Sequence, residues 1–414
     1  MSKKLVVMKL GGSSVADADR IKNVANRVVR CRKAGNNVVV VVSAPGDMTD
    51  DLIAMAEKIT DAPSDREMDM LLSTGEQVSI ALLAMAIHVH KTDAVSLTGP
   101  QAGIFADDTH TRARITGIKP VKVFSELKKG NVVIVAGFQG LNPNQDITTL
   151  GRGGSDLTAV ALAAALKADV CEIYTDVKGV YTTDPRIEPE ARKIERISYE
   201  EMLEMAGAGA QVMQPRSIEV GKNFGVDIHV RSSFTDEEGT LITAEVPQME
   251  QVVVSGVAYD KNQAKITITN VQDRPGTAAK VFGPLADAGV NVDMIIQSSA
   301  ADGTNDISFT VARSDVKKAM PLLEKISSEL KAGRATLDDK VAKVSIVGVG
   351  MRSHPGIAAK MFRTLADNGI NLDMISTSEI KVACVVKDTD GEKAVRVLHK
   401  VFELSKTGKA KAKA

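Results

Sequence analysis

Two glycine-rich loops hold the residues whose types and spacing are most able to do chemistry. The first lies in LVVMKLGGSS, residues 5–14, where an apolar strand pattern leads into glycines and a helix start. Such glycines let backbone N–H groups approach an anion, and a helix N-terminus adds partial positive charge. Lys9 would neutralise phosphate charge there. The spacing matches neither the G-x-x-x-x-G-K-[ST] loop nor the G-x-G-x-x-G fingerprint, so a tight turn that needs glycine explains it equally well.

The second loop is TLGRGGSD, Thr149–Asp156, which also opens a helical pattern. Arg152 supplies a planar fork of N–H donors that suits a carboxylate or a phosphate. Ser155 is equally well explained as an N-cap, and Asp156 as a favourable charge in the first helical turn. Two such loops in one chain favour a phosphate or carboxylate site over two ordinary turns.

Three further segments place polar side chains where a ligand would bind. Tyr174–Arg186, YTDVKGVYTTDPR, follows a buried strand, and α/β domains bind ligands in loops at the carboxyl ends of strands. Its charges favour a nucleotide lid slightly over an ordinary surface loop. Ser43–Thr49 also ends a strand, and Glu76 interrupts an apolar helical pattern, where an unpaired charge is costly. A structural role explains these last two equally well.

Composition excludes several classes of function. Lys plus Arg and Asp plus Glu both number 52, so the formal charge is zero, which argues against a dedicated binder of nucleic acid or anionic membrane. Aromatic residues make up 3% with no Trp, which argues against base-stacking surfaces. The six histidines show no metal-ligand spacing, and the three cysteines form neither a zinc pattern nor a disulfide framework. We therefore predict no metal site built by the protein and no covalent catalysis.

The chain shows no sign of export or membrane insertion. No uncharged stretch of about 18 apolar residues occurs, and the N-terminal apolar run ends at Lys9. Scattered cysteines are typical of a reducing compartment. We expect a cytoplasmic protein.

Residues 1–245 alternate strand and helix patterns, which predicts one doubly wound, mostly parallel α/β domain. Val38–Val42 is a run of five valines, typical of a strand covered on both faces. The predicted strands are Leu5–Leu10, Val38–Ser43, Ala94–Leu97, Val132–Phe138, Val170–Asp176 and Asp227–Ser232. An alanine-rich helix is expected over Ser155–Lys167.

The remainder contains a repeat. Pro275–Ile295 and Pro355–Ile375 are identical at 14 of 21 positions, at a constant offset of 80. Strands flank each copy, each copy begins with Pro at an expected first helical position, and a second helix follows. The pattern predicts two small β-α-β-β-α-β, ferredoxin-like modules.

Counting strands indicates how the two modules are connected. The second copy ends after its helix, Lys393–Leu404, and the residues that follow have no β-forming pattern. An unassigned strand, Val252–Ala258, precedes the first copy, and a three-stranded module would leave an apolar edge exposed. We expect that strand to complete the second module. The predicted domains are 1–245, 264–340, 250–263 plus 341–404, and a disordered basic tail, 405–414.

Together the motifs carry a resemblance. In order, KLGGSS, VVSAPGDMTD, LLSTGEQVS, VAGFQGLN, TTLGRGGSD, YTDVKGVYTTDPR and QPRS resemble the aspartate kinases of the amino-acid kinase superfamily. The paired PG-x-AAK repeats resemble that family's tandem ACT-type regulatory modules. The likeness extends over nearly the whole chain, and its specificity lies in the order of seven individually weak motifs.

The resemblance implies an ATP- and Mg²⁺-dependent enzyme. The family transfers the γ-phosphoryl group of ATP to the β-carboxylate of L-aspartate, giving 4-phospho-L-aspartate, the first step toward lysine, threonine and methionine. The attacking carboxylate is already ionised at neutral pH, so no general base is required. Lys9, Mg²⁺ and the loop amides must offset its repulsion by the phosphates.

The resemblance also implies residue roles. Lys9, Arg152 and Asp156 would be catalytic, with Asp156 holding the lysine, Arg152 clamping a substrate carboxylate and Glu76 receiving its ammonium. The implied ATP-binding residues are Lys9, Leu10, Gly11, Gly12, Tyr174, Thr175, Asp176, Val180, Tyr181, Thr182, Thr183, Asp184, Pro185 and Arg186. The implied substrate-binding residues are Ser43, Thr49, Glu76, Arg152, Gly153, Gly154 and Ser155. In QVMQPRS many family members have Lys where this chain has Gln211, and a neutral amide there would weaken phosphate attraction.

Regulation is implied in the repeats, with lysine and threonine together as effectors. The implied effector residues are Asp273, Arg274, Pro275, Gly276, Asn291 and Gln297 in the first copy, and Ser353, His354, Pro355, Asn371, Leu372, Thr377 and Ser378 in the second. A homodimer, or an assembly with a shorter regulatory subunit that starts near Met249, is the expected partner arrangement.

Two alternatives stay open at this point. A glutamate, acetylglutamate or uridylate kinase would share the glycine loops, although the repeats and the Thr-Gly-Glu stretch speak against it. A non-enzymatic sensor would explain the repeats but not Lys9, Arg152 and Asp156.

Overall fold

The computed structural model describes all residues except 1–2, 211, 245–252, 300–302 and 407–414. The described chain divides into two compact units. Unit 1 holds the described residues up to 244, apart from Tyr181–Arg192 and Gly207–Ala210. Unit 2 holds these two segments and the described residues from 253 on.

Unit 1 contains two sheets and seven helices among its described residues. The strands are β1 (Leu5–Leu10), β2 (Asn37–Val42), β3 (Ala94–Leu97), β4 (Ile104–Ala106), β5 (Ile115–Ile118), β6 (Val132–Ala136), β7 (Gln139–Leu141), β8 (Ile147–Thr149), β9 (Val170–Thr175), β10 (Arg196–Ser198), β11 (Ile228–Ser232) and β12 (Thr240–Thr243). The helices are α1 (Ala18–Lys33), α2 (Met48–Glu57), α3 (Asp65–His88), α4 (Val121–Lys129), α5 (Gly154–Leu166), α6 (Tyr199–Gly207) and α7 (Pro215–Phe224), with a 3-10 turn at Gly12–Ser14.

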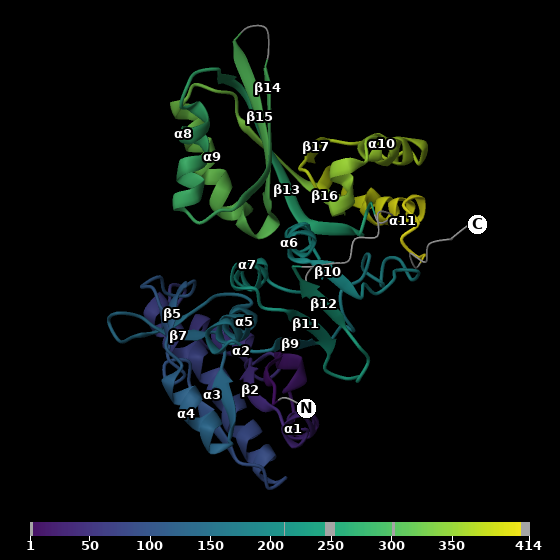
Figure 1. Cartoon of the computed structure of the whole chain (residues 1–414). Coiled ribbons are helices and arrows are strands. Elements are labelled where there is room, and N and C mark those ends of the chain that lie inside the picture. The colour runs from purple at the N-terminus through teal and green to yellow at the C-terminus, as the bar shows by residue number, and fades with distance from the viewer. Residues whose placement is uncertain (1–2, 211, 245–252, 300–302, 407–414) are drawn as a thin grey trace, which may run out of the picture. The chain divides into compact units, whose positions relative to one another are not determined.

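The larger sheet has the order β10-β12-β11-β9-β1-β2-β6-β3. Its neighbouring strands are parallel except for β11 and β12, which are antiparallel. β1 and β2 pair in parallel near the middle of this sheet, so their carboxyl ends, which lead into the loops at Lys9–Gly12 and Ser43, lie at the same edge of the sheet. Figure 1 labels β2 and also β9, the strand on the other side of β1. The predicted doubly wound α/β domain is confirmed.

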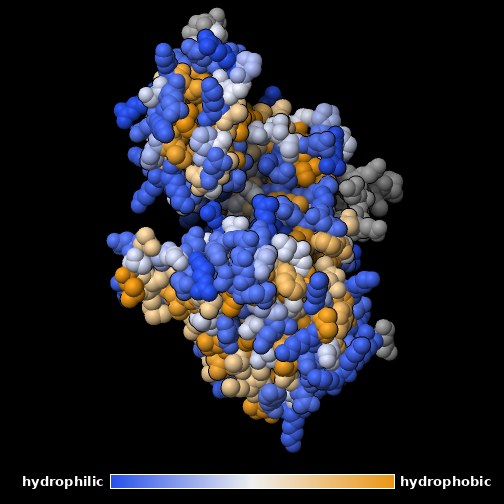
Figure 2. Space-filling view, turned by 90° about the vertical axis from the view of Figure 1, so that its left-hand side faces the viewer, coloured by the Kyte–Doolittle hydropathy of each residue, from blue (hydrophilic) through white to orange (hydrophobic). Residues whose placement is uncertain are grey.

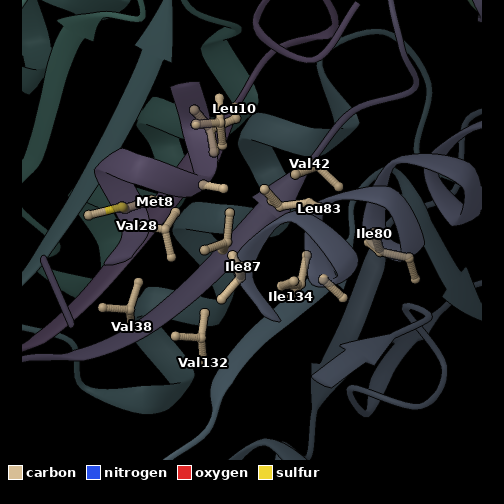
Figure 3. Close-up of a cluster of buried hydrophobic side chains, with 14 of the residues drawn as sticks. Met8, Leu10, Val28, Val38, Val42, Ile80, Leu83, Ile87, Val132 and Ile134 are labelled. Carbon is tan, nitrogen blue, oxygen red and sulfur yellow. The ribbon is translucent and has the colours of Figure 1, made fainter. Parts of the chain in front are cut away.

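The core explains why these strands form. Five of the six residues of β2 are fully buried valines, as in a strand covered on both faces. Met8 and Leu10 of β1, Ile134 of β6, Val28 of α1 and Leu83 of α3 pack in one apolar cluster (Figure 3). Helix α5 is apolar and small on nearly all sides and is buried for most of its length. This packing fixes α3 and α5, which carry predicted site residues.

A second, four-stranded sheet of order β5-β4-β7-β8 was not predicted. Two of its strands, β7 and β8, flank the turn before the Thr149–Asp156 loop, and three of its four strands are only three residues long. Such short strands have too few residues for a period-2 pattern to be recognised.

Helix α3 is the one described helix that is long and apolar enough to cross a membrane by length and composition. Half of that stretch is buried inside the protein, as expected for a core helix. Some of its apolar side chains, Val78, Leu82 and Met85, remain exposed. The space-filling view shows hydrophobic residues exposed at the surface among hydrophilic ones (Figure 2), which is normal for folded domains.

Unit 2 contains one six-stranded sheet and four helices among its described residues. Its strands are β13 (Gly256–Gln272), β14 (Val292–Ser299), β15 (Thr304–Ala312), β16 (Ala335–Val347), β17 (Met374–Thr377) and β18 (Lys381–Lys387). Its helices are α8 (Thr277–Asp287), α9 (Val316–Glu329), α10 (Ile357–Asp367) and α11 (Gly391–Val401), with 3-10 turns at Arg313–Asp315, Val349–Ser353 and Asp388–Asp390.

The two repeats share this sheet, of order β14-β15-β13-β16-β18-β17. The second half of β13 pairs with β15 and with the first half of β16, which gives the first repeat four strands. Gly256–Asp260, at the start of β13, pairs with Lys343–Val347 of the second repeat. The first half of β13 thus supplies the fourth strand that the second repeat lacks, in the place left open by the strand count. The predicted part before residue 253 lies outside the described residues.

Two sequence expectations about the repeats were wrong. The strand expected at Val252–Ala258 is not separate, because from Gly256 it continues into the first repeat as β13, and β16 likewise runs through both modules and pairs with β13 in each. Pro275 and Pro355 do not occupy the first helical position. Gly276 and Gly356 cap α8 and α10 with φ of 90° and 93°, a left-handed conformation that favours glycine, and each proline precedes that cap.

Tyr181–Arg192, expected within residues 1–245, groups with unit 2. Val257 donates its backbone N–H to the Thr182 carbonyl, and Arg396 donates to the Ile187 carbonyl. The Thr182 hydroxyl also lies 2.9 Å from Nε2 of His399 on α11. This segment therefore packs on the second repeat.

Candidate active site

Lys9 and Asp156 form the centre of the candidate site. Lys9 is the penultimate residue of β1, Asp156 lies in the first turn of α5, and Lys9 Nζ lies 2.7 Å from Asp156 Oδ1. Both side chains are about nine-tenths buried, with 13% and 11% exposed. This ion pair thus joins the two glycine-rich loops that were predicted to carry chemistry. It holds the Lys9 ammonium group at the carboxyl end of β1.

The first glycine loop leaves no room for a side chain at Gly12, whereas Gly11 has space for a Cβ. A Cβ on Gly12 would lie 2.8 Å from the Ala44 carbonyl oxygen, and one on Gly11 would lie 3.5 Å from Lys9 Nζ. Gly46 donates its backbone N–H to the Gly12 carbonyl. The loop therefore packs directly on the chain after β2. Leu10 itself is buried in the core, so only its backbone belongs to the loop.

Glu76 lies on α3, and only 3% of it is exposed. Its Oε1 accepts the backbone N–H of Ala44 at 3.1 Å, while Oε2 has no hydrogen-bond partner among the described residues. Burial raises the pKa of this carboxyl to about 7, and the Ala44 hydrogen bond opposes that rise only in part. Ala44 thus connects Glu76 to the Gly12 loop, and one buried carboxylate oxygen has no donor among the described residues.

Ser43 and Thr49 lie near the two ends of the segment that connects β2 to α2 and contains Ala44. Ser43 continues β2, where its N–H donates to the Leu10 carbonyl and its carbonyl accepts the Ser79 hydroxyl of α3 at 2.7 Å. Thr49 lies in the first turn of α2, and both side chains are half-buried. The chain after β2 therefore lies between the glycine loop and α3.

The Thr149–Asp156 loop is tightly held while Arg152 remains exposed. Gly153 has φ of 73°, and a Cβ there would lie 1.7 Å from Cγ of Gln214. Arg216 donates to the carbonyls of Leu150 and Ala113, at 2.8 and 3.0 Å. Ser155 is buried against Gly137, whose Cβ would meet the Ser155 hydroxyl at 2.7 Å. The exposed Arg152 side chain thus extends from a backbone that is held in place just before the N-terminus of α5. Gly154, the first residue of α5, is buried.

The segment expected to cover a nucleotide is placed differently. The Tyr174 ring is 2% exposed, stacks under the Arg27 guanidinium and donates its hydroxyl to Glu172. Its ring therefore does not cover a ligand, and burial raises its pKa to about 12. The Val180 N–H is bonded to the Thr240 hydroxyl. Thr175 donates to the exposed Asp176, and both remain at the carboxyl end of β9.

The six residues from Tyr181 to Arg186 belong to unit 2. Thr182 and Thr183 are buried there, and their contact with a nucleotide stays a prediction. The Arg186 guanidinium contacts Asp184 at 2.7 Å and lowers the pKa of that carboxyl. Contact of Tyr181, Asp184, Pro185 and Arg186 with a nucleotide stays a prediction. Gln211 lies outside the described residues.

Sequence reasoning missed several residues that shape this site. Phe138, in the VAGFQGLN motif, has φ of 69°, a strained conformation for a bulky residue, and its carbonyl accepts the Leu150 N–H. Asp69 and His110 are also bound to this region. Nothing in the local pattern marks a strained Phe, and the partners of Asp69 lie about 40 to 80 residues away in the sequence.

The implied effector residues of both repeats occupy matching places. In each copy they lie at the turn that enters the first helix and on the following strand or the residues before it, and all of them are exposed except the half-buried Leu372. Asp273 donates its N–H to the Gly303 carbonyl.

A cavity of about 580 Å³ lies elsewhere, in unit 1, and is lined by Leu157, Val220 and Arg216 among others, but by none of the predicted site residues.

Comparison with known proteins identifies the family. A model described as the amino acid kinase family matches residues 4–232, and an ACT domain model matches 266–326 and 344–402. The chain is 51% identical over 405 residues to an aspartokinase of Mycolicibacterium smegmatis, covering 97% of this chain and 96% of that protein. This chain belongs to the aspartokinases of the amino acid kinase family. It is similarly 52% identical over 402 residues to an aspartokinase of Pseudomonas aeruginosa, covering 97% and 98%.

Solved aspartokinases share the fold. The structure of Escherichia coli aspartokinase III in complex with aspartate and ADP matches with a TM-score of 0.83 at 27% identity, covering 96% of this chain and 99% of that one. The same enzyme in complex with lysine and aspartate matches with a TM-score of 0.75 at 27% identity, with the same coverage. Aspartokinase membership decides against the other amino-acid kinases and against a non-enzymatic sensor.

Proposed function

We propose that this aspartokinase transfers the γ-phosphoryl group of ATP to the β-carboxylate of L-aspartate, forming 4-phospho-L-aspartate, the first step toward lysine, threonine and methionine. The observation that carries the substrate assignment is the unpartnered Oε2 of buried Glu76, beside the Lys9–Gly12 loop. A buried carboxylate oxygen without a donor is costly to the fold alone. An amino-acid ammonium group is the donor that fits it.

The proposed reaction divides the work among few residues. A β-carboxylate oxygen of aspartate bonds to the γ-phosphorus, the bond from that phosphorus to the β,γ-bridging oxygen breaks, and ADP leaves without any proton transfer. Lys9, held by Asp156, offsets the charge on the transferring group. Arg152 binds the α-carboxylate and Glu76 the ammonium.

Mg²⁺ fits this donor set as an ion bound with the nucleotide. Among the described residues no three His, Cys, Asp or Glu side chains gather as a metal site. Mg²⁺ commonly keeps several waters and uses one or two carboxylates together with substrate phosphates. Asp156, which already contacts Lys9, is one carboxylate at this place. Bound there, Mg²⁺ would neutralise phosphate charge.

An ATP-dependent hydroxamate assay tests the proposed reaction. Hydroxylamine traps an acyl phosphate as a coloured hydroxamate, so aspartate is expected to give product and glutamate to give little. Equal product from both amino acids would contradict the substrate assignment. Arg152→Ala is expected to raise KM for aspartate about tenfold or more by removing a charge-assisted clamp.

We further propose that lysine and threonine together inhibit through the repeats. Support comes from the matching turns at Gly276 and Gly356 and from the lysine complex of Escherichia coli aspartokinase III. Backbone N–H groups after Pro275 suit a carboxylate, and Asp273 and Asn291 suit an ammonium and a hydroxyl. Asp273→Ala is expected to weaken inhibition, whereas Asp287→Ala, also exposed near α8, should not. Unchanged activity with both effectors, together with wild-type behaviour of Asp273→Ala, would contradict this.

We also propose how this chain assembles with other subunits, on the basis of its sequence. A homodimer, or a complex with a shorter subunit that starts near Met249, would bring further regulatory modules together. Met249 lies outside the described residues. Size measurement of the purified chain, alone and after co-expression with a chain starting at Met249, tests both arrangements.

A further inference from the structure

Asp69 is a fully buried carboxylate that the proposed reaction does not use. It lies on α3 and is 0% exposed. Its oxygens accept the Thr149 hydroxyl at 2.5 Å and the Thr111 N–H at 3.1 Å, and Oδ2 lies 2.6 Å from Nδ1 of His110. A buried charge is tolerated only when it is well supplied with donors, and Asp69 receives three different ones. Because the carboxylate accepts, Nδ1 of His110 is the donor in this pair.

All three donors lie next to the loop that carries Arg152. Thr149 is the last residue of β8, three positions before Arg152. Thr111 has φ of 63°, which is strained for a β-branched residue, and its carbonyl would lie 3.3 Å from a Cβ on Gly151. Ala113 donates its N–H to the Thr149 carbonyl. Asp69 therefore fixes both the start of the Arg152 loop and the strained segment packed against it.

The same helix holds the other end of the proposed aspartate site. Glu76 follows Asp69 by seven residues, about two helical turns or roughly 10 Å along α3. Glu76 bonds to Ala44 and Asp69 bonds to Thr149, so α3 is joined to both loops. Arg216 and Gln214 hold the loop around Arg152 within its own region. The bonds of Asp69 add the connection from the start of this loop to α3, the helix that carries Glu76.

We propose that Asp69 and His110 are positioning residues that set the distance between Arg152 and Glu76 and thereby the affinity for aspartate. The inference rests on the proposed function, because it takes Arg152 and Glu76 as the groups that hold the α-carboxylate and the ammonium. Nucleotide binding at the Lys9–Gly12 loop does not depend on this anchor. Loss of the His110 hydrogen bond thus acts on one substrate selectively.

Steady-state kinetics with each substrate varied in turn test the proposal on the full chain. His110→Ala is expected to raise KM for aspartate about tenfold, the scale of a lost hydrogen bond to a charged group, while KM for ATP changes less than about twofold. His110→Asn, whose side-chain amide donates from near the Nδ1 position, is expected to restore most of the wild-type KM. Asp108→Asn, an exposed carboxylate in the same loop, is the matched control and should behave as wild type.

Thr149→Val gives a second variant that removes one donor to Asp69 and keeps the side-chain shape. It is expected to raise KM for aspartate as well, and less than additively when combined with His110→Ala, because both act through Asp69.

The results that overturn the proposal are distinct. An unchanged KM for aspartate in His110→Ala, with only a lower unfolding midpoint, shows a purely structural role. Equal defects in His110→Asn and His110→Ala, or equal rises in KM for both substrates, also contradict it. A wild-type chain that forms no ADP in response to aspartate contradicts the proposed function and this inference together, whereas an active wild type with unchanged variants contradicts the inference alone.

Discussion

At the scale of single residues, Glu76 is the group whose chemistry changes most on folding. Burial raises its pKa to about 7, so the carboxyl changes charge within the neutral range. Only the ionised form attracts the aspartate ammonium. We predict that KM for aspartate rises as the pH falls from 8 to 6, measured with saturating ATP. In Glu76→Gln the KM is expected to be high throughout and nearly independent of pH, whereas exposed Glu57→Gln should follow the wild type.

The same shift predicts a change in stability. Because the folded pKa of Glu76 lies above its unfolded value of 4.5, its contribution to stability is fully present below pH 4.5 and is lost as the pH rises through about 7. Between pH 6 and 8 the unliganded wild type should lose roughly 1 kcal/mol of unfolding free energy from this group. Urea unfolding of wild type and Glu76→Gln at both pH values measures it. The same pH dependence in both proteins would contradict the shift.

At the scale of elements, the two glycine loops and the sheet edge they share make the site. Gly153 opens α5 at φ of 73°, in contact with Gln214. Gly153→Ala is expected to displace Gln214 or the start of α5 and to lower kcat/KM for aspartate about tenfold or more, through the position of Arg152. Gly35→Ala is the matched control, since Gly35 also has positive φ, 96°, and no atom within 4 Å of the added Cβ. Equal activity of the two variants would show that the contact with Gln214 is unimportant.

The sequence predicts some elements much better than others. Among the six strands predicted for residues 1–245, β1 and β3 begin and end where the apolar runs predict, and the other four agree within two residues at each end. The signal is strongest for β2 and β6, because a strand that is buried on both faces needs an uninterrupted run of apolar, mostly β-branched residues. The β5-β4-β7-β8 sheet was missed because its strands are too short, and contacts of Asp69 with Thr149, 80 residues away, leave no local signal.

The same limit applies to the candidate site. Lys9, Asp156, Arg152 and Glu76 stand out because a charge or a glycine run interrupts an apolar pattern. Tyr174 and Thr182 are polar in sequence, yet the structure buries both side chains. Burial of a polar residue depends on a distant partner, here Glu172 and His399.

At the scale of the whole molecule, one strand joins both regulatory repeats. The start of β13 pairs with Lys343–Val347, and Val257 packs in the core of the second repeat with Ile346. A fragment of residues 249–406 is therefore expected to unfold cooperatively, whereas residues 262–406, which lack Gly256–Asp260, should lose stable structure in the second repeat. Circular dichroism and hydrogen exchange of both fragments measure this. Equal protection of β16 and β18 in both fragments would contradict it.

The most direct test of the central claim is the hydroxamate assay on Lys9→Met. Lys9 and Asp156 unite the two glycine loops, and loss of a preorganised charge at the transferring phosphoryl group costs on the order of 3 kcal/mol or more, a fall in kcat of at least about a hundredfold. Lys4→Met, an exposed lysine that precedes β1, is the matched control and should retain activity. Unfolding midpoints within a few degrees of wild type, with kcat lost only in Lys9→Met, are the predicted result. Near-normal kcat in Lys9→Met would contradict the site and the mechanism built on it.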